Sequence, residues 1–396
     1  MPPSQIVRRS AVLIAGLLLL AAPGAAGDRL VEKRVFSMPS YTTEGGQAIN
    51  GVRVGWEAYG TLNAARDNVI LVTHFFSGTS HAAGRYAPED AAPGYWDSII
   101  GAGKPIDTDR FYVVSSDTLV NLNVKDPRVT TTGPATIDPA TGRPYGMRFP
   151  IVGIRDFVNV QKALLASLGI TRLYAVAGAS MGALQAYEWA ISYPALVERI
   201  IPVIGEPESD AFTIGWMSLW GAPIRLDPKW NGGDYYGRAE PVDGLAAALR
   251  LITQHARHDR WAQKTYGRRW AAAGRDPGKS WDSVYAYEEA LSQIAATRVR
   301  SSDANSFLYL CKAIQLFGEG HGALAEALRG VRARALIVSS KTDLIFDPEY
   351  SERAAVLLGR AGQPAVHVTI EGDMGHAEGV VGIAAAGEAI RRFLSE

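Results

Sequence analysis

Apolar runs alternate with segments of helical periodicity along most of the chain. Continuous apolar, β-branched runs predict strands buried on both faces, and they cover residues 69–76, 110–117, 172–178, 198–205, 334–340 and 365–370. Segments with apolar residues at helical spacing lie between or after them, at 154–169, 183–194, 348–362 and 382–396. This alternation predicts an α/β protein with a mostly parallel central sheet and helices on both faces.

Two segments depart from this alternation. Residues 35–57 have short alternating patterns on either side of EGGQAING, which predicts a β-hairpin at the start of the fold. Residues 206–330 are helical, aromatic and rich in arginine, and they separate the fourth apolar run from the fifth. We therefore expect a helical insert, residues 206–330, that acts as a lid and divides the sheet domain into residues 28–205 and 331–396.

The first 27 residues have the pattern of a secretory signal peptide. Arg8 and Arg9 precede an apolar run over residues 11–22, and small residues follow up to Gly27. The run is shorter than the ~20 residues that a membrane-spanning helix needs. We expect cleavage before Asp28, a periplasmic or secreted mature protein, and no stable membrane span; an uncleaved anchor is the alternative.

The composition argues against several partners. Lysine plus arginine and aspartate plus glutamate each number 40, so the formal net charge is zero and no basic field would hold nucleic acid. Cys311 is the sole cysteine, and it lies in an apolar run typical of a buried helix. No histidine–carboxylate cluster has zinc spacing, and no phosphate- or dinucleotide-binding glycine motif is present. We expect neither a metal nor a cofactor.

The motif GASMG, residues 178–182, sets Ser180 between two glycines where a predicted strand meets a predicted helix. In that context G-x-S-x-G indicates a nucleophile elbow, in which Gly178 and Gly182 are needed because the turn is tight. The elbow would expose the Ser180 hydroxyl at the carboxyl edge of the sheet. We expect the N–H groups of Met181, at the start of the helix, and of Phe76, after the first buried strand, to bind an oxyanion.

A serine nucleophile needs a base and an orienting acid, and in this architecture they follow in the order serine, acid, histidine. Asp343 comes just after the strand predicted at 334–340, and His376 follows the last strand. Asp347 and Asp373 are rival acids, but Asp347 fits the cap of the next helix and Asp373 is too close to His376 in sequence. Other roles are expected for three further histidines: His74 fixes its loop, and His255 and His258 are solvated.

Several long segments resemble the homoserine O-acetyltransferases, a family with the α/β-hydrolase fold. They are YGTLNAARDNVILVTHFFSGTSH, GYWDSIIGAGKPIDTDRFYVVSSD, TGPATIDPATGRPYG, FPIVGIRDFVNVQKALLASLGI, GASMGALQAYEWAISYP, DANSFLYL and TDLIFDPE. The resemblance implies a triad at Ser180, Asp343 and His376, a helical lid over a tunnel, and ping-pong transfer of an acyl group through the serine. It also suggests a homodimer formed through the lid.

Two positions depart from the pattern of that family. The family follows its catalytic histidine with an aspartate that holds the amino acid, whereas this chain has Ala377. It also places an arginine for the substrate carboxylate before the DP-W-GG-Y segment, where an ungapped reading gives Gly221 and a shifted register gives Arg225. A predicted export signal would also separate the protein from acetyl-CoA, which is an intracellular donor.

Three functions stay open from the sequence. The first is an exported serine enzyme that forms an acyl-Ser180 intermediate from a small acyl ester and passes the acyl group to water or to another alcohol. The second is a CoA-dependent O-acetyltransferase of homoserine or a related alcohol, and the third is a non-catalytic binding protein. We expect the first, because losing paired charges from a buried site would weaken the binding of a zwitterion by several kcal/mol.

Overall fold

The computed structural model describes residues 30–396, so the predicted leader at 1–27 lies outside the described residues. An eight-stranded sheet with the order β1-β2-β6-β3-β9-β10-β11-β12 forms the centre of the fold. Its strands are β1 (Arg34–Thr42), β2 (Ala48–Tyr59), β3 (Val69–Thr73), β6 (Tyr112–Ser116), β9 (Ala175–Ala179), β10 (Arg199–Val203), β11 (Arg334–Ser340) and β12 (Ala365–Ile370). The predicted hairpin is the β1–β2 pair, which is antiparallel, as is β2–β6, and every pair from β6 to β12 is parallel. The predicted α/β class is confirmed.

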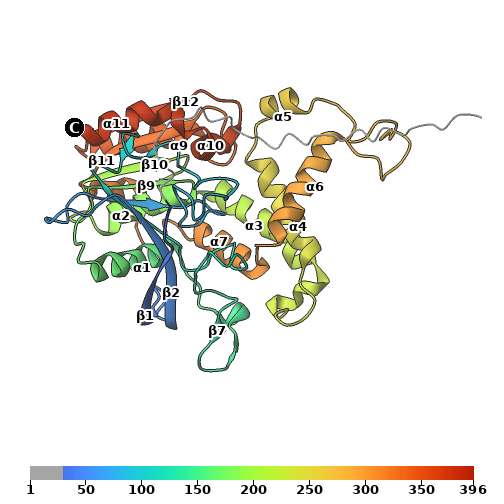
Figure 1. The fold of residues 1–396 in the computed structure, drawn as a ribbon, viewed down its shortest axis with the longest axis horizontal. Coiled ribbons are helices and arrows are strands. Elements are labelled where there is room, and N and C mark those ends of the chain that lie inside the picture. The colour runs from blue at the N-terminus through green and yellow to red at the C-terminus, as the bar shows by residue number, and fades with distance from the viewer. Residues whose placement is uncertain (1–29) are drawn as a thin grey trace, which may run out of the picture.

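Helices cover both faces of the sheet because successive side chains of its strands point to opposite sides. On β3, Leu71 belongs to the apolar cluster of one face and Ile70 to that of the other. Residues of α1 (Ile154–Ser167), α2 (Met181–Ser192) and α9 (Pro348–Arg360) join the first cluster. Residues of α11 (Gly387–Ser395) join the second, and in Figure 1 α11 and α1 lie on opposite sides of the strands.

Short elements occupy the connections. They are β4 (Ile100–Gly101), β5 (Ile106–Asp107), β7 (Ile137–Asp138), β8 (Arg143–Pro144), η1 (Gly146–Arg148), η3 (Gly375–Ala377), α10 (Glu378–Val381) and η4 (Ile383–Ala386). The segment predicted as one closing helix at 382–396 is thus η4 followed by α11. No helix within residues 30–396 combines the length and apolar character needed to cross a bilayer.

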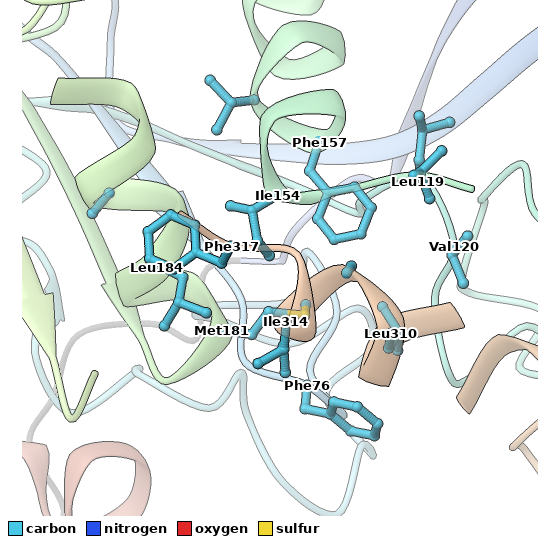
Figure 2. Packing of buried hydrophobic residues seen from close by; sticks show 14 of the residues in the cluster. Phe76, Leu119, Val120, Ile154, Phe157, Met181, Leu184, Leu310, Ile314 and Phe317 are labelled. Carbon is cyan, nitrogen blue, oxygen red and sulfur yellow. The ribbon is translucent and has the colours of Figure 1, made fainter. Parts of the chain in front are cut away.

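The chain between β10 and β11 is helical. It contains α3 (Ala211–Leu226), η2 (Pro228–Gly233), α4 (Val242–His255), α5 (Asp259–Thr265), α6 (Ala286–Val299), α7 (Ala304–Gln315) and α8 (Leu324–Arg329). Helix α7 packs into the core, where Leu310 and Ile314 lie in one apolar cluster with Phe76 and Met181 (Figure 2). Helices α5 and α6 project to one side of the sheet domain (Figure 1). The helical insert is therefore anchored beside the elbow through α7.

Candidate active site

Ser180 lies between β9 and α2 in a conformation that non-glycine residues rarely adopt, with φ 57° and ψ −121°. The surrounding backbone explains the two glycines. A Cβ on Gly178 would overlap the hydroxyl of Thr73, and a Cβ on Gly182 would overlap the carbonyl oxygen of Thr73. Because β3 and the first turn of α2 approach this closely, the elbow is sterically possible only with glycine on either side of the serine.

We expect Gly182→Ala to destabilise the protein by about 3 kcal/mol or more, because the added methyl group meets a backbone atom that cannot rotate away. Urea unfolding followed by tryptophan fluorescence measures this. Gly359, in the last turn of α9, is a matched control because a Cβ there would meet nothing within 4 Å. Gly359→Ala should gain about 0.5–1 kcal/mol. Equal effects of the two substitutions would contradict the steric account.

The side chains of Ser180, His376 and Asp343 form a continuous hydrogen-bonded relay. The Ser180 hydroxyl lies 2.8 Å from Nε2 of His376, and Nδ1 of His376 lies 2.8 Å from Oδ2 of Asp343. The other oxygen of Asp343 accepts the backbone N–H groups of Ile345 and Phe346, at 2.8 and 3.1 Å. A carboxylate accepts all three bonds only if Nδ1 carries the imidazole proton, which leaves Nε2 free to accept from the serine.

The two rival acids take other positions. Oδ1 of Asp347 accepts the N–H of Glu349 at 2.9 Å, so this side chain caps α9 as predicted. Asp373 precedes η3 on the same loop as His376, whereas Asp343 reaches the ring from the end of β11. The structure therefore brings Asp343, and neither rival, to the imidazole.

Two loops meet where the oxyanion donors are predicted. Met181 is the first residue of α2, so its N–H has no acceptor within the helix. Phe76 is buried in the loop after β3. Two hydrogen bonds join this loop to α2. The Thr73 hydroxyl donates to the Gly182 carbonyl at 2.8 Å, and the Gln185 amide donates to the His74 carbonyl at 3.3 Å. The helix start and the loop after β3 are thus held beside Ser180.

A buried polar network fixes the loop that carries Phe76. Oδ1 of Asp117 accepts the N–H of Ser80 at 2.8 Å, and the Asn121 amide donates to the Gly78 carbonyl at 3.0 Å.

Glu57 is the centre of the network, and it contacts Lys33 at 2.9 Å, His81 at 3.0 Å, Tyr59 at 2.8 Å and Tyr86 at 2.5 Å. Burial opposes ionisation of Glu57, yet the hydrogen bond from His81 and the charge of Lys33 hold its pKa below the usual value. His74 also serves its own loop, since Nδ1 lies 2.8 Å from the Phe75 carbonyl.

The prediction of a solvated His255 is wrong. Its ring is buried between α3 and the loop after Asp343, because His255 continues the apolar stripe of Leu245, Leu249 and Ile252 along α4. His258 is partly buried and lies 2.7 Å from Asp259. Sequence analysis also gave no role to His321, which pairs with the buried Glu188 at 2.9 Å.

Charged side chains do not occupy the positions where the resemblance places homoserine-binding groups. Gly221 is buried on α3, and a Cβ there would lie 2.7 Å from a methyl group of Leu308. Arg225 does not replace the missing arginine, because it is exposed and donates to the Ser218 carbonyl at 3.3 Å. Glu378, next to Ala377, is turned into its own loop, where it accepts the N–H of Met374 at 3.0 Å.

Within residues 30–396 no group of three or more histidine, cysteine, aspartate or glutamate side chains is arranged to hold a metal ion. Cys311 is buried in α7, as predicted, and burial raises the pKa of its thiol well above the usual value. The thiol is therefore an inert core group.

Comparison with known proteins gives matches along most of the chain. Residues 102–377 match the family model described as alpha/beta hydrolase fold. A homoserine O-acetyltransferase of Symbiobacterium thermophilum is 40% identical over 358 residues, which are 89% of this chain and 91% of that protein.

Two solved structures are similar over nearly their whole length. Esterase E22 is 52% identical, with a TM-score of 0.88, and the match covers 92% of this chain and 100% of that one. The homoserine O-acetyltransferase of Bacillus anthracis is 38% identical, also with a TM-score of 0.88, and the match covers 93% of this chain and 98% of that one. The chain is thus similar both to a named esterase and to named acetyltransferases.

Proposed function

From the premise that the chain belongs to the α/β-hydrolase fold family, and within it to the homoserine O-acetyltransferase family, we propose that it is a serine esterase that hydrolyses small acyl esters through an acyl-Ser180 intermediate. The observation that carries the enzymatic part is the relay from Ser180 through His376 to Asp343, with 2.8 Å at both contacts. Similarity to esterase E22 supports the hydrolytic part.

Each residue of the relay has one task in the proposed reaction. Oγ of Ser180 attacks the ester carbonyl carbon while Nε2 of His376 takes the hydroxyl proton, and the carboxylate of Asp343 stabilises the imidazolium. The N–H groups of Met181 and Phe76 bind the oxyanion. His376 then gives its proton to the departing alkoxide, so the alcohol leaves and the acyl group stays on Ser180.

Water completes the cycle by the same steps. His376 takes a proton from a water molecule, the hydroxide attacks the acyl carbon, and the proton returns to Oγ of Ser180 as the carboxylic acid is released. Water is the proposed acceptor because Ala377 and Gly221 offer no charge to the ammonium and carboxylate groups of homoserine. A buried zwitterion without partners would lose several kcal/mol of binding.

The test compares two reactions of the purified protein. Short and medium p-nitrophenyl esters measure hydrolysis, and acetyl-CoA with homoserine, followed by the appearance of free thiol, measures transfer. We expect ester hydrolysis without homoserine-dependent release of thiol. Thiol release that rises with homoserine would favour the second candidate, an O-acetyltransferase, which similarity to the Bacillus anthracis structure supports. If the protein showed neither activity and no labelling by a fluorophosphonate, the third candidate, a non-catalytic binding protein, would be favoured.

We also propose that the protein is exported, because residues 1–27 carry the pattern of a signal peptide. Mass spectrometry of the protein recovered from cell fractions should find a mature chain that begins at Asp28, outside the cytoplasm. An N-terminus at Met1 in a cytoplasmic fraction would overturn export and would restore access to acetyl-CoA.

We further propose a homodimer formed through the helical insert. Phe212, Leu219 and Leu226 lie seven residues apart on α3, and they are 63%, 55% and 80% exposed. Seven-residue spacing places them on one face of the helix, as in a helix that packs against another helix. An apolar face of this kind is typical of a protein interface.

Replacing Leu219 and Leu226 together by lysine should convert the dimer to a monomer, because four charges would then face each other across a symmetric interface. Light scattering after gel filtration measures the mass. Val356→Lys, which changes an exposed apolar residue on α9 of the sheet domain, is the control and should stay dimeric. A wild-type protein that is monomeric at micromolar concentration would contradict the proposal.

A further inference from the structure

His255 is the last residue of α4, and its buried ring has two specific hydrogen-bond partners. Nδ1 lies 3.2 Å from Nε1 of Trp220 on α3, and Nε2 lies 2.8 Å from the carbonyl oxygen of Leu344. An indole N–H only donates and a carbonyl only accepts, so the ring is neutral with its proton on Nε2. Burial favours the same state, because it lowers the pKa of His255 against the opposing effect of the Leu344 bond.

The pair formed by Trp220 and His255 contacts both the loop that carries Asp343 and the loop that carries Phe76. Leu344 directly follows Asp343, the residue that holds the His376 ring. At the other end, the Trp220 indole packs edge-on against Phe76, with ring centroids 5.6 Å apart. One continuous path of contacts therefore runs from the oxyanion loop through the helical insert to the acid.

The sheet alone does not couple these two loops tightly. The loop of Phe76 leaves β3 and the loop of Asp343 leaves β11, and β9 and β10 lie between those strands. For acyl transfer, the oxyanion donors and the relay must both be correctly placed around the same carbonyl group. A displacement of about 1 Å can cost about 100-fold in rate. A contact outside the sheet that joins the two loops would limit their displacement relative to each other.

We propose that the Trp220–His255 hydrogen bond is a positioning device through which the helical insert holds the oxyanion loop and the Asp343 loop in register for acyl transfer. This inference rests on the proposed serine esterase function. It assigns both residues to positioning, since their hydrogen bonds join them to each other and to Leu344 and not to Ser180. It also gives the insert a part in the rate of the reaction besides its predicted role as a lid.

Two tryptophans on α3 provide a matched test. Trp216 packs against the same His255 ring, with centroids 3.9 Å apart and ring planes tilted by 31°, whereas Trp220 makes the hydrogen bond. Trp220→Phe keeps an aromatic ring against Phe76 but removes the donor, and it should lower kcat for p-nitrophenyl acetate by about 10- to 100-fold with KM within about 2-fold. Trp216→Phe removes no bond to His255 and should keep kcat within about 3-fold.

Substitution of His255 gives an independent check if Trp220→Phe impairs folding. The amide of glutamine can accept from Trp220 and donate to Leu344, whereas leucine can do neither. His255→Gln should therefore retain most of kcat, and His255→Leu should match Trp220→Phe, with unfolding midpoints measured for all four variants. Wild-type kcat in both Trp220→Phe and His255→Leu would overturn the inference. A wild-type protein without esterase activity or fluorophosphonate labelling would instead overturn the proposed function, and the positioning role with it.

Discussion

Ser180→Ala should lower kcat for ester hydrolysis by about 10⁴-fold or more. The methyl group has no nucleophile to offer, so acylation stops and the residual rate reflects the oxyanion donors alone. This loss equals more than about 5 kcal/mol of transition-state stabilisation. Initial rates with a series of p-nitrophenyl esters measure it, and mass spectrometry after fluorophosphonate treatment should find the label on Ser180 in the wild type alone.

The fold should survive this substitution. Ser180 is held by its backbone, since its N–H donates to the Val203 carbonyl at 2.9 Å, and alanine keeps that bond. Ser167→Ala on α1 makes the same chemical change away from the site and should leave kcat unchanged. If Ser180→Ala hydrolysed esters at the wild-type rate, another group would be the nucleophile and the proposed mechanism would be lost.

The sequence predicts the framework of the site because its signals are local. Ser180 is marked by glycines on either side, and the glycines are required because β3, β9 and the start of α2 approach one another closely at Thr73. Asp343 and His376 are marked by the ends of two buried strands, where parallel strands of one sheet meet at the same edge. Helix α2 begins at Met181, two residues before the segment predicted at 183–194, since the strained Ser180 itself ends the turn.

What supports the framework is not local, and the sequence does not predict it. Glu57 lies on β2, yet it is held by Lys33, His81 and Tyr86, which approach from separate parts of the chain. Glu188 on α2 meets His321 only because the insert returns to the sheet domain. His255 differs from these, because its place on the apolar stripe of α4 is a local signal that indicates burial.

Asp343→Asn should lower kcat by about 10⁴-fold although it preserves the shape of the side chain. The reason lies in the two N–H groups of Ile345 and Phe346, which donate to Oδ1 of Asp343. Asparagine has one oxygen, and these donors will hold it in the same place. The NH₂ group is then forced toward His376, where Nδ1 has to accept instead of donate. The imidazole proton moves to Nε2, which faces Ser180 and can no longer take its proton.

Asp343→Ala tests this account, because a methyl group imposes no tautomer on His376. Its kcat should therefore be no lower than that of Asp343→Asn, even though alanine removes more of the side chain. The same asparagine substitution at the rival acids, Asp347 and Asp373, should change kcat by less than about 3-fold, and stability should change little at Asp347, because asparagine caps the start of α9 about as well as aspartate. A large loss of kcat at Asp373 with little effect at Asp343 would show that Asp343 is not the orienting acid. The relay would then have to form through the loop that carries Asp373.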